Sequence, residues 1–215
     1  MDSYRIPTKS GASEYVDKRS RFLGLVRPVG SEDEARTIIA ACKKQYHDAR
    51  HNCWCYLLRD GTERYSDDGE PQGTAGIPML EVFRRAGVTN VVCVVTRYFG
   101  GIKLGAGGLI RAYGHAAVLG LDAATHIAMT PFQEVAVTVG YDLLATVEHW
   151  LRQQEIRHGE SEYGENVTLH LLLPPEEVET RLTELTDLTS ANFTAVKGAR
   201  TCLALPCPKD NKASD

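Results

Sequence analysis

The sequence predicts an α+β protein of two domains, residues 1–130 and 133–207, followed by a short tail at residues 208–215. A chain of 215 residues is long enough for one or two domains of ordinary size. Residues 1–130 carry 17 Lys and Arg against 14 Asp and Glu, whereas residues 131–215 carry 7 against 14. This asymmetry suggests two domains with different roles. Both halves contain strand and helix patterns, so each domain is expected to be α+β.

The elements of the first domain follow from capping residues, turns and hydrophobic spacing. Ser31 and Glu34 match a capping box, with apolar residues at helical spacing after them. Asp60-Gly61 is a hairpin turn pair. The elements expected in order are extended chain over 14–29 with a turn near 18–20, a helix over 31–46, a strand over 52–59, a turn-rich segment over 66–76, a short helix over 77–85, a buried strand over 90–96 and a long helix over 107–124.

The second domain is expected to begin after a linker at residues 129–132. Asp142 is expected to cap its first helix, and Pro174 to open its second, where proline is tolerated. The elements expected are a strand over 133–140, a helix over 142–154, a hairpin over 156–163 and 166–173, a helix after 174 and a strand over 193–201. The order βαββαβ is that of a ferredoxin-like domain.

Composition excludes several classes of protein. The longest aliphatic run, residues 91–95, is too short to span a bilayer, and the N-terminal residues contain no apolar signal segment. The six cysteines are scattered and do not form a dense disulfide framework. We therefore expect a cytoplasmic protein with no membrane partner. The net charge of −4 argues against a globally basic nucleic-acid binder, so any such contact would be local.

The stretch from Val95 to Ala117 contains six glycines and three fixed cations, and no carboxylate. A strand, a glycine loop and a helix N-terminus in that order form a general anion site, because free backbone N–H groups and the helix dipole favour a phosphate. The loop matches neither GxxxxGK[ST] nor GxGxxG. The alternative is that the glycines serve only helix–sheet packing.

The residues predicted to contact an anion or a nucleic acid come from this loop and from a second basic run near the start of the chain. They are Arg97, Tyr98, Gly100, Gly101, Lys103, Gly105, Gly107, Gly108 and Arg111, with Arg19 and Arg21. Aromatic side chains beside cations suit single-stranded nucleic acid, through base stacking and phosphate contacts. At least one of Tyr98 and Phe99 is nevertheless expected to belong to the core.

Two other groups of residues could carry chemistry. Asp67, Asp68 and Glu70 could hold Mg²⁺, or could cap the following helix and pair with the basic loop. The second reading is favoured, because turn residues of this kind close many ordinary loops. His51, Cys53 and Cys55 would share one face of a strand, but their spacing is not that of familiar zinc sites, and nothing pairs a nucleophile with a base. No metal, cofactor or catalytic residue is assigned.

Two long motifs resemble those of the IMPACT/YigZ family, in its bacterial YigZ branch. They are YSDDGEPQGTAGIP (Tyr65–Pro78) and VTRYFGGIKLGAGGLIRAY (Val95–Tyr113), with Arg19–Phe22 and His51–Trp54 as shorter matches. The resemblance implies a first domain like domain 2 of ribosomal protein S-five and domain IV of elongation factor G, and a second domain like domain V of that factor. It also implies a link to translational control, which in eukaryotic members runs through competition for an activator of an initiation-factor kinase.

Two functions of different classes follow. The first is a non-catalytic regulator that binds RNA, the ribosome or a translation factor through the basic glycine loop. The second is an enzyme acting on a small phosphorylated ligand or nucleotide, with the same loop as a phosphate cradle. The oligomeric state is left open.

Overall fold

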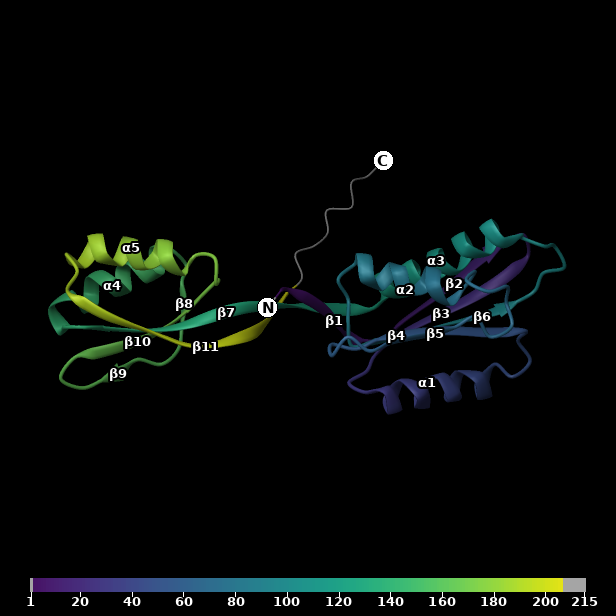
Figure 1. Cartoon of the computed structure of the whole chain (residues 1–215), viewed down its shortest axis with the longest axis horizontal. Coiled ribbons are helices and arrows are strands. Elements are labelled where there is room, and N and C mark those ends of the chain that lie inside the picture. The colour runs from purple at the N-terminus through teal and green to yellow at the C-terminus, as the bar shows by residue number, and fades with distance from the viewer. Residues whose placement is uncertain (1, 207–215) are drawn as a thin grey trace. The chain divides into compact units, whose positions relative to one another are not determined.

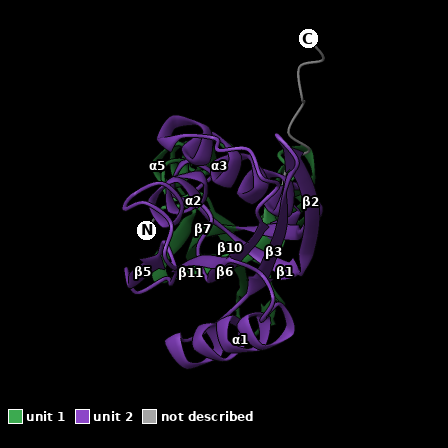
Figure 2. Cartoon of the chain, turned by 90° about the vertical axis from the view of Figure 1, so that its right-hand side faces the viewer, with its two compact units in different colours: residues 1–3, 129–204 green, residues 4–128, 205–215 purple. Residues whose placement is uncertain are grey.

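The computed structural model describes residues 2–206, so the tail expected at residues 208–215 lies outside the described residues. The chain forms two compact units, one made mainly of residues 129–204 and the other mainly of residues 4–128 (Figure 2). Both units combine helices with a sheet, which confirms the predicted two-domain α+β fold.

The larger unit is built on a five-stranded antiparallel sheet with the strand order β2-β3-β6-β4-β5. Its elements are β1 (Tyr4–Lys9), β2 (Gly11–Asp17), β3 (Ser20–Pro28), α1 (Glu32–Gln45), β4 (His51–Leu57), β5 (Glu63–Ser66), α2 (Gly76–Arg85), β6 (Val91–Tyr98) and α3 (Ala106–Ala123). The predicted segments correspond to β2–β3, α1, β4, α2, β6 and α3. Strands β1 and β5 were not predicted.

Helices cover both faces of this sheet, with α2 and α3 on one face and α1 on the other (Figure 1). Side chains alternate along the central strand β6, so Val91, Cys93 and Val95 join the core under α2 and α3. Val92 and Val94 pack in the core under α1. Because both faces of β6 are buried, its sequence is a continuous apolar run.

The start of α1 carries the predicted capping pair in a modified form. The Ser31 hydroxyl accepts from the Glu34 N–H at 3.3 Å, as a capping box requires. The Glu34 carboxylate reaches one residue further back than in that motif and accepts from the Gly30 N–H at 2.7 Å. Both contacts satisfy amides at the point where the chain enters α1.

The hairpin between β2 and β3 closes with a strained two-residue turn. Asp17 pairs with Ser20, and the residues between them, Lys18 and Arg19, have φ values of +44° and +66°. Positive φ at both central positions defines a type I′ turn, which favours Asn-Gly over longer side chains. A positive φ strains any L residue that carries a Cβ.

Replacing Arg19 by Gly should therefore raise the free energy of unfolding by about 1 kcal/mol, because glycine adopts this conformation without strain. Arg27→Gly, which removes the same charge from an extended position in β3, should lower it by about 0.5–1 kcal/mol. Urea denaturation of the two variants checks the prediction. An equal effect of both variants would contradict it.

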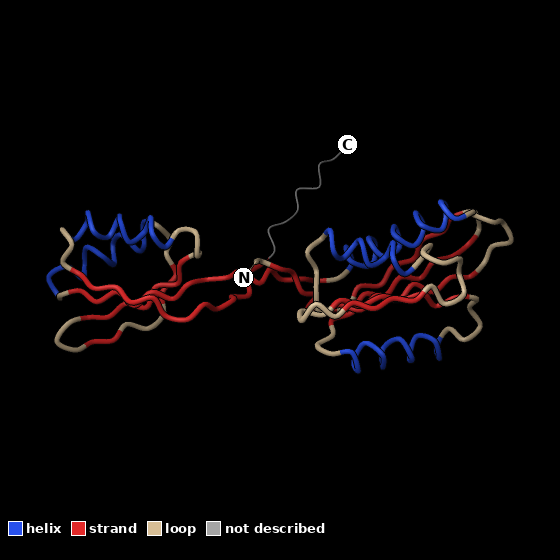
Figure 3. Tube along the Cα trace, in the orientation of Figure 1, coloured by secondary structure: helices blue, strands red, loops and turns tan. Residues whose placement is uncertain are grey.

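The smaller unit has the predicted βαββαβ order, with α4 and α5 on the same face of its sheet (Figure 3). Its elements are β7 (Thr125–Val139), α4 (Tyr141–Gln153), β8 (Arg157–His158), β9 (Glu162–Tyr163), β10 (Val167–Leu173), α5 (Val178–Thr189) and β11 (Phe193–Pro206). Strand β10 pairs antiparallel with β7, β8 and β9, and β11 pairs with β7. The second strand of the motif is thus broken into β8 and β9.

Three local predictions differ from the structure. Pro174 does not open the second helix of this unit, because α5 begins at Val178 with Glu177 as its N-cap. The division between the two units falls at residues 128 and 129, next to the predicted linker at 129–132, but residues 129–132 are strand and not irregular chain, because β7 runs without a break from Thr125 to Val139. Pro131 precedes the segment 133–139 that pairs with β10, so its missing N–H removes no bond from that ladder. Asp142 does not cap α4: the N-cap is Gly140, no side chain bonds the cap, and Asp142 lies in the first turn.

Candidate anion-binding site

A pocket of about 440 Å³ lies in the larger unit where the glycine loop leads into α3. One side is formed by the end of β6, the loop over 99–105 and the first turn of α3. The other side is formed by the start of β4 and the loop over 67–75. Its lining includes Arg50, His51, Glu70, Arg97, Phe99, Lys103, Gly105 and Ala106. We call this cavity the α3 pocket.

The first turn of α3 offers backbone donors to the α3 pocket. Its N-cap is Gly105, which has a φ of +75° and supplies no capping side chain. The first turn contains no acidic residue. The first bonded amide is that of Leu109, which donates to the Gly105 carbonyl, so the amides of Ala106 to Gly108 meet no acceptor among the described residues. Free amides and the positive end of the dipole make this terminus suited to an anion.

The glycine loop is held against the strained turn between β2 and β3. A Cβ on Gly100 would lie 2.0 Å from the carbonyl carbon of Arg19, so only glycine fits there. The Gly100 N–H donates to the Ser20 hydroxyl at 3.1 Å. The close approach brings the exposed Arg19 beside the predicted loop residues. Gly101, Gly107 and Gly108 complete the loop and the first turn of α3.

A buried ion pair forms one wall of the α3 pocket. Arg97 Nη1 lies 2.6 Å from Glu70 Oε1, and the two side chains are 7 % and 4 % exposed. The Tyr113 hydroxyl donates to the same carboxylate oxygen at 2.8 Å. Arg97 also lies 5.5 Å from the ring centres of Phe22 and Phe99. Arg97, predicted as a direct anion contact, is therefore bound first to the protein's own carboxylate.

His51 lies beside this pair, and one of its two ring nitrogens is already in a hydrogen bond. Its Nδ1 is 2.8 Å from the Asp68 carbonyl, which can only accept, so Nδ1 carries the proton. Its Nε2 faces Glu70 Oε1 at 3.9 Å, beyond hydrogen-bond distance. Nε2 is thus the unbonded nitrogen at the wall of the α3 pocket.

The carboxylates of Asp67 and Asp68 are engaged by the protein itself. Asp67 accepts from the amides of Gly73, Ala75 and Gly76 at 2.7, 3.0 and 2.8 Å, which closes the loop and satisfies the start of α2. Asp68 accepts from the Asn52 N–H at 2.7 Å and from Lys43 at 2.5 Å. This is the geometry of the loop-capping alternative. Among residues 2–206, no group of three or more His, Cys, Asp or Glu side chains is placed to hold a metal ion.

Cys53 is buried as a neutral thiol. Its Sγ donates to the Asp67 carbonyl at 3.0 Å, and burial raises the pKa of the thiol to about 12. Because the thiolate is the nucleophile and the metal ligand, the position is unsuited to either role.

Several exposed cations near the start of α3 have no acidic partner among the described residues. Lys103 lines the α3 pocket, and Arg50 lies 6.0 Å from the ring centre of Phe99 at its rim. Arg111 folds back over the first turn, where its Nη1 is 3.7 Å from the position that a Cβ on Gly107 would occupy. Arg19 is exposed beside Gly100. Arg50 was missed by the sequence analysis, although its place directly before a buried strand could have signalled it.

The sheet separates Arg21 and Tyr98 from the rest of the predicted site. Alternation along β6 puts Arg97 on the α3 face and Tyr98 on the α1 face. There Arg21 pairs with Glu14 at 2.9 Å, and the Tyr98 hydroxyl donates to Asp48 at 2.9 Å, which raises the pKa of the phenol. The expectation that Tyr98 or Phe99 joins the core is wrong, since Tyr98 is only partly buried and Phe99 is 42 % exposed.

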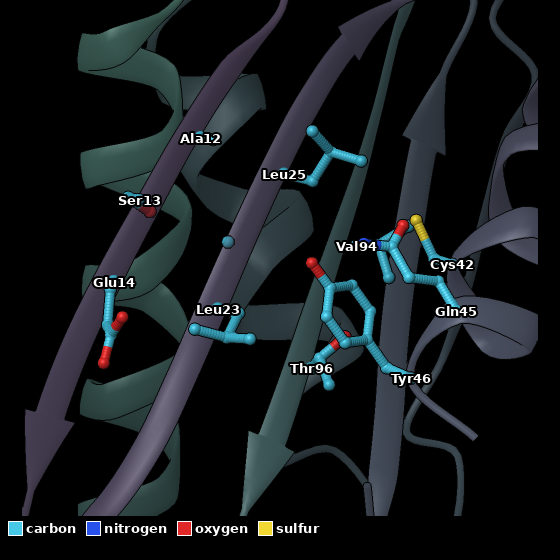
Figure 4. A pocket seen from close by; sticks show the side chains of 11 residues that line it. Ala12, Ser13, Glu14, Leu23, Leu25, Cys42, Gln45, Tyr46, Val94 and Thr96 are labelled. Atoms are coloured by element: carbon cyan, nitrogen blue, oxygen red, sulfur yellow. The ribbon is translucent and has the colours of Figure 1, made fainter. Parts of the chain in front are cut away.

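A second pocket, of about 480 Å³, opens on the α1 face of the sheet (Figure 4). Leu23 and Leu25 from β3, Val94 from β6, and Cys42 and Tyr46 from the end of α1 line it. It holds no exposed cation in its lining, so it has none of the features of an anion site.

Comparisons with known proteins agree with this architecture. The sequence model of the Impact N-terminal domain matches residues 18–121, and that of a domain of unknown function, DUF1949, matches residues 137–192. A solved structure described as that of a hypothetical protein matches with a TM-score of 0.58 at 31 % identity, covering 93 % of this chain and 98 % of the other.

Curated relatives match along most of their length. The IMPACT family member YvyE of Bacillus subtilis is 37 % identical over 205 residues, with 94 % of each chain covered. The IMPACT family member YigZ of Escherichia coli is 34 % identical over 197 residues, covering 90 % of this chain and 97 % of that protein. Protein IMPACT of Rattus norvegicus is 28 % identical over 109 residues, covering 48 % of this chain and 34 % of that protein. The chain belongs to the IMPACT family.

In the part of the chain that the structure describes, none of the helices is both long and apolar enough to cross a membrane.

Proposed function

We propose that this chain is a non-catalytic regulator acting in translation, and that it binds RNA through a basic surface at the start of α3. The basic surface consists of Arg19, Lys103 and Arg111, beside the free amides of Ala106 to Gly108. One observation carries the proposal: three exposed cations without acidic partners among the described residues lie around a helix N-terminus that no side chain caps. Membership of the IMPACT family supports a translation-related regulatory role at the level of the family.

Charge favours a local contact. The segment 131–215 carries 7 Lys and Arg against 14 Asp and Glu and would repel RNA, whereas residues 82–121 contain no acidic residue. We therefore propose that residues 1–130 form the RNA-binding domain and residues 133–207 a second domain with another role. Binding carried by a few Lys and Arg contacts to phosphates falls steeply as salt rises.

The enzyme alternative has less support from the geometry. The carboxylates of Asp67 and Asp68 are held by backbone amides, that of Glu70 by Arg97, and Cys53 is a neutral thiol. Among the residues lining the α3 pocket, His51 alone keeps a free nitrogen suited to proton transfer. A protein partner with an acidic surface would use the same cations, and the tests below separate it from RNA.

Replacing Arg19, Lys103 and Arg111 together by Ala should weaken binding of single-stranded RNA and reduce the slope of log Kobs against log salt by about 2 in magnitude, because each lost phosphate contact removes about 0.7. Fluorescence anisotropy of a labelled RNA, titrated at several salt concentrations, measures both quantities. All three side chains are exposed, so the fold should be retained.

The matched control replaces Arg27, Lys44 and Arg85 by Ala. These side chains are also exposed and make no ion pair with a described acid, so the change in net charge is identical. The control should bind RNA nearly as the unaltered chain does. Equal weakening in both triple variants would mean that the net charge, and not this surface, governs binding. Absence of RNA binding by the unaltered chain would contradict the proposal and would favour a protein partner with an acidic surface.

A further inference from the structure

The two faces of the five-stranded sheet are not equally covered. On one face α2 and α3 pack against each other, whereas on the other face α1 is the only helix among the described residues of the larger unit (Figure 1). A helix with its side chains is about 10 Å wide and neighbouring strands lie about 4.8 Å apart, so one helix covers about two strands. The buried strand residues of the core under α1 come from β4 and β6. On this face, the next two strands of the sheet, β3 and β2, lie beyond the helix.

These two strands present an apolar surface on the α1 face. Leu25 pairs across the sheet with Val94 on one side and Ala12 on the other, so the three side chains share this face, as do Leu23 and Val16 by alternation. Val16 is 56 % exposed, and both leucines are only partly buried. Ala12, Leu23 and Leu25 line the pocket of about 480 Å³, with the end of α1 as its side wall (Figure 4). We call Ala12, Val16, Leu23 and Leu25 the apolar strip.

The element that fits the apolar strip is a helix. An extended chain laid on the face of a sheet would turn its own N–H and C=O groups toward apolar side chains, where an unpaired polar group costs free energy. A helix bonds these groups internally and presents a stripe of apolar side chains. A strand would instead pair at the outer edge of β2, and it would then lie beside the sheet and not over Leu23 and Leu25. The uncovered width of two strands matches one helix.

The charges around the apolar strip define the flanks of that helix. Residues 9–29, which contain β2, β3 and the turn between them, carry five Lys and Arg against two Asp and Glu. One of the two acids, Glu14, is already paired with Arg21 at 2.9 Å. Arg27 follows Leu25 on the same face, is exposed and pairs with no described acid. We infer that the apolar strip is a docking surface for an amphipathic helix of another protein, with a stripe of apolar residues flanked by Asp and Glu.

Segments of this chain fit the apolar strip less well. Ile110 and Val118 are 44 % and 39 % exposed on α3, but residues 82–121 contain no acid, so α3 of a second copy would bring Arg111 to a surface that is already positive. Residues 207–215 contain no Leu, Ile, Val, Phe or Met and therefore offer no apolar stripe. The inference goes beyond the proposed RNA binding, because the start of α3 lies on the other face of the sheet.

Photo-crosslinking in cells identifies what covers the apolar strip. The photoreactive residue p-benzoylphenylalanine replaces Ala12, which is exposed at the border of the strip, or Val118 on α3 as the matched control. Mass spectrometry then locates the crosslinked residue of the partner. We expect the Ala12 position, and not the Val118 position, to crosslink to another protein, within a segment that has apolar residues at i, i+3, i+4 and i+7 and more Asp and Glu than Lys and Arg.

A synthetic peptide of the crosslinked segment then measures the contribution of the apolar strip, by isothermal titration against the full chain. Leu23→Ser removes an apolar contact and Arg27→Glu reverses the complementary charge, so each should weaken binding at least about tenfold. The matched controls Val118→Ser and Arg85→Glu should change binding by less than about twofold, because both side chains lie outside the strip. Circular dichroism checks the fold of each variant. If Leu23→Ser does not fold, Arg27→Glu still tests the surface, since Arg27 is exposed.

The outcomes separate the possible occupants. A crosslink from Ala12 to an acidic amphipathic segment, with peptide affinity lost in Arg27→Glu and kept in Arg85→Glu, would support the inference. Crosslinks from Ala12 to RNA, to a second copy of this chain or to a segment without that pattern would overturn it, as would no crosslink above that of Val118. Equal affinity of the peptide for the strip variants and the control variants would overturn it as well. None of these results depends on RNA binding, so the two proposals can fail separately.

Discussion

Arg97→Met is expected to lower the free energy of unfolding of the larger unit by about 3–5 kcal/mol, because it leaves a buried carboxylate without its cation. The Glu70 side chain is 4 % exposed and keeps only the Tyr113 hydroxyl as a donor after the change. Denaturation by urea, followed by the fluorescence of Trp54 in a Trp150→Phe background, reports on this unit alone, since Trp54 lies on β4 and Trp150 on α4.

The double variant Arg97→Met/Glu70→Gln tests the cause. It removes the Glu70 charge that Arg97→Met alone leaves buried without a cation, so it should lose less stability than Arg97→Met alone. A coupling energy of the two sites near zero, or a loss below about 1 kcal/mol in the single variant, would show that the ion pair is not the source of the effect. The result also bears on binding experiments, because a binding defect of an Arg97 variant can come from its lower stability and not from a lost contact to a ligand.

Asp67→Ala is expected to destabilise the same unit by about 3 kcal/mol, since three backbone amides lose one charged acceptor. Asp67→Asn keeps a single acceptor oxygen, so its stability should lie between that of Asp67→Ala and that of the unaltered chain. Asp33→Ala is the matched control, because its side chain is 94 % exposed and its ion pair with Arg36 lies at the surface, so the change should stay within about 1 kcal/mol.

The same urea titration measures these variants. A loss in Asp67→Ala no greater than in Asp33→Ala would contradict the view that this carboxylate closes the loop over 67–75. An added Mg²⁺ ion that restored the stability of Asp67→Asn would contradict it as well, because a capping carboxylate has no metal to bind.

Local patterns predicted most of the fold, because the signals involved act over a few residues. Ser31 with Glu34 located the start of α1, and the apolar run before Thr96 located β6. Strand β7 was shortened because Pro131 resembles a linker residue, although pairing with β10 begins only at Gln133. A strand of 15 residues that contains a proline has no distinct sequence signal.

The candidate site was predicted in part, and the errors have a common cause. The sequence indicates that Lys103 lies in the glycine loop and Arg111 one turn into the helix after it, and α3 does begin between them, at Ala106. It could not show that Arg97 meets Glu70, because that contact joins residues 27 positions apart. The separation of Tyr98 from Arg97 could have been predicted, since the side chains of adjacent residues on a strand point to opposite faces of the sheet. The position of His51 beside Glu70 depends on how β4 meets the loop over 67–75, and no local sequence pattern indicates that contact.

The most direct test of the central claim is crosslinking of RNA to the chain in cells, followed by sequencing of the recovered RNA. It should be run for the unaltered chain, for Arg19→Ala/Lys103→Ala/Arg111→Ala and for the control Arg27→Ala/Lys44→Ala/Arg85→Ala. We predict that ribosomal or transfer RNA is recovered with the unaltered chain and with the control, and is lost in the first triple variant. Recovery of the same RNA from all three chains, or of none above background from the unaltered chain, would contradict the assignment of the start of α3 as an RNA-binding surface.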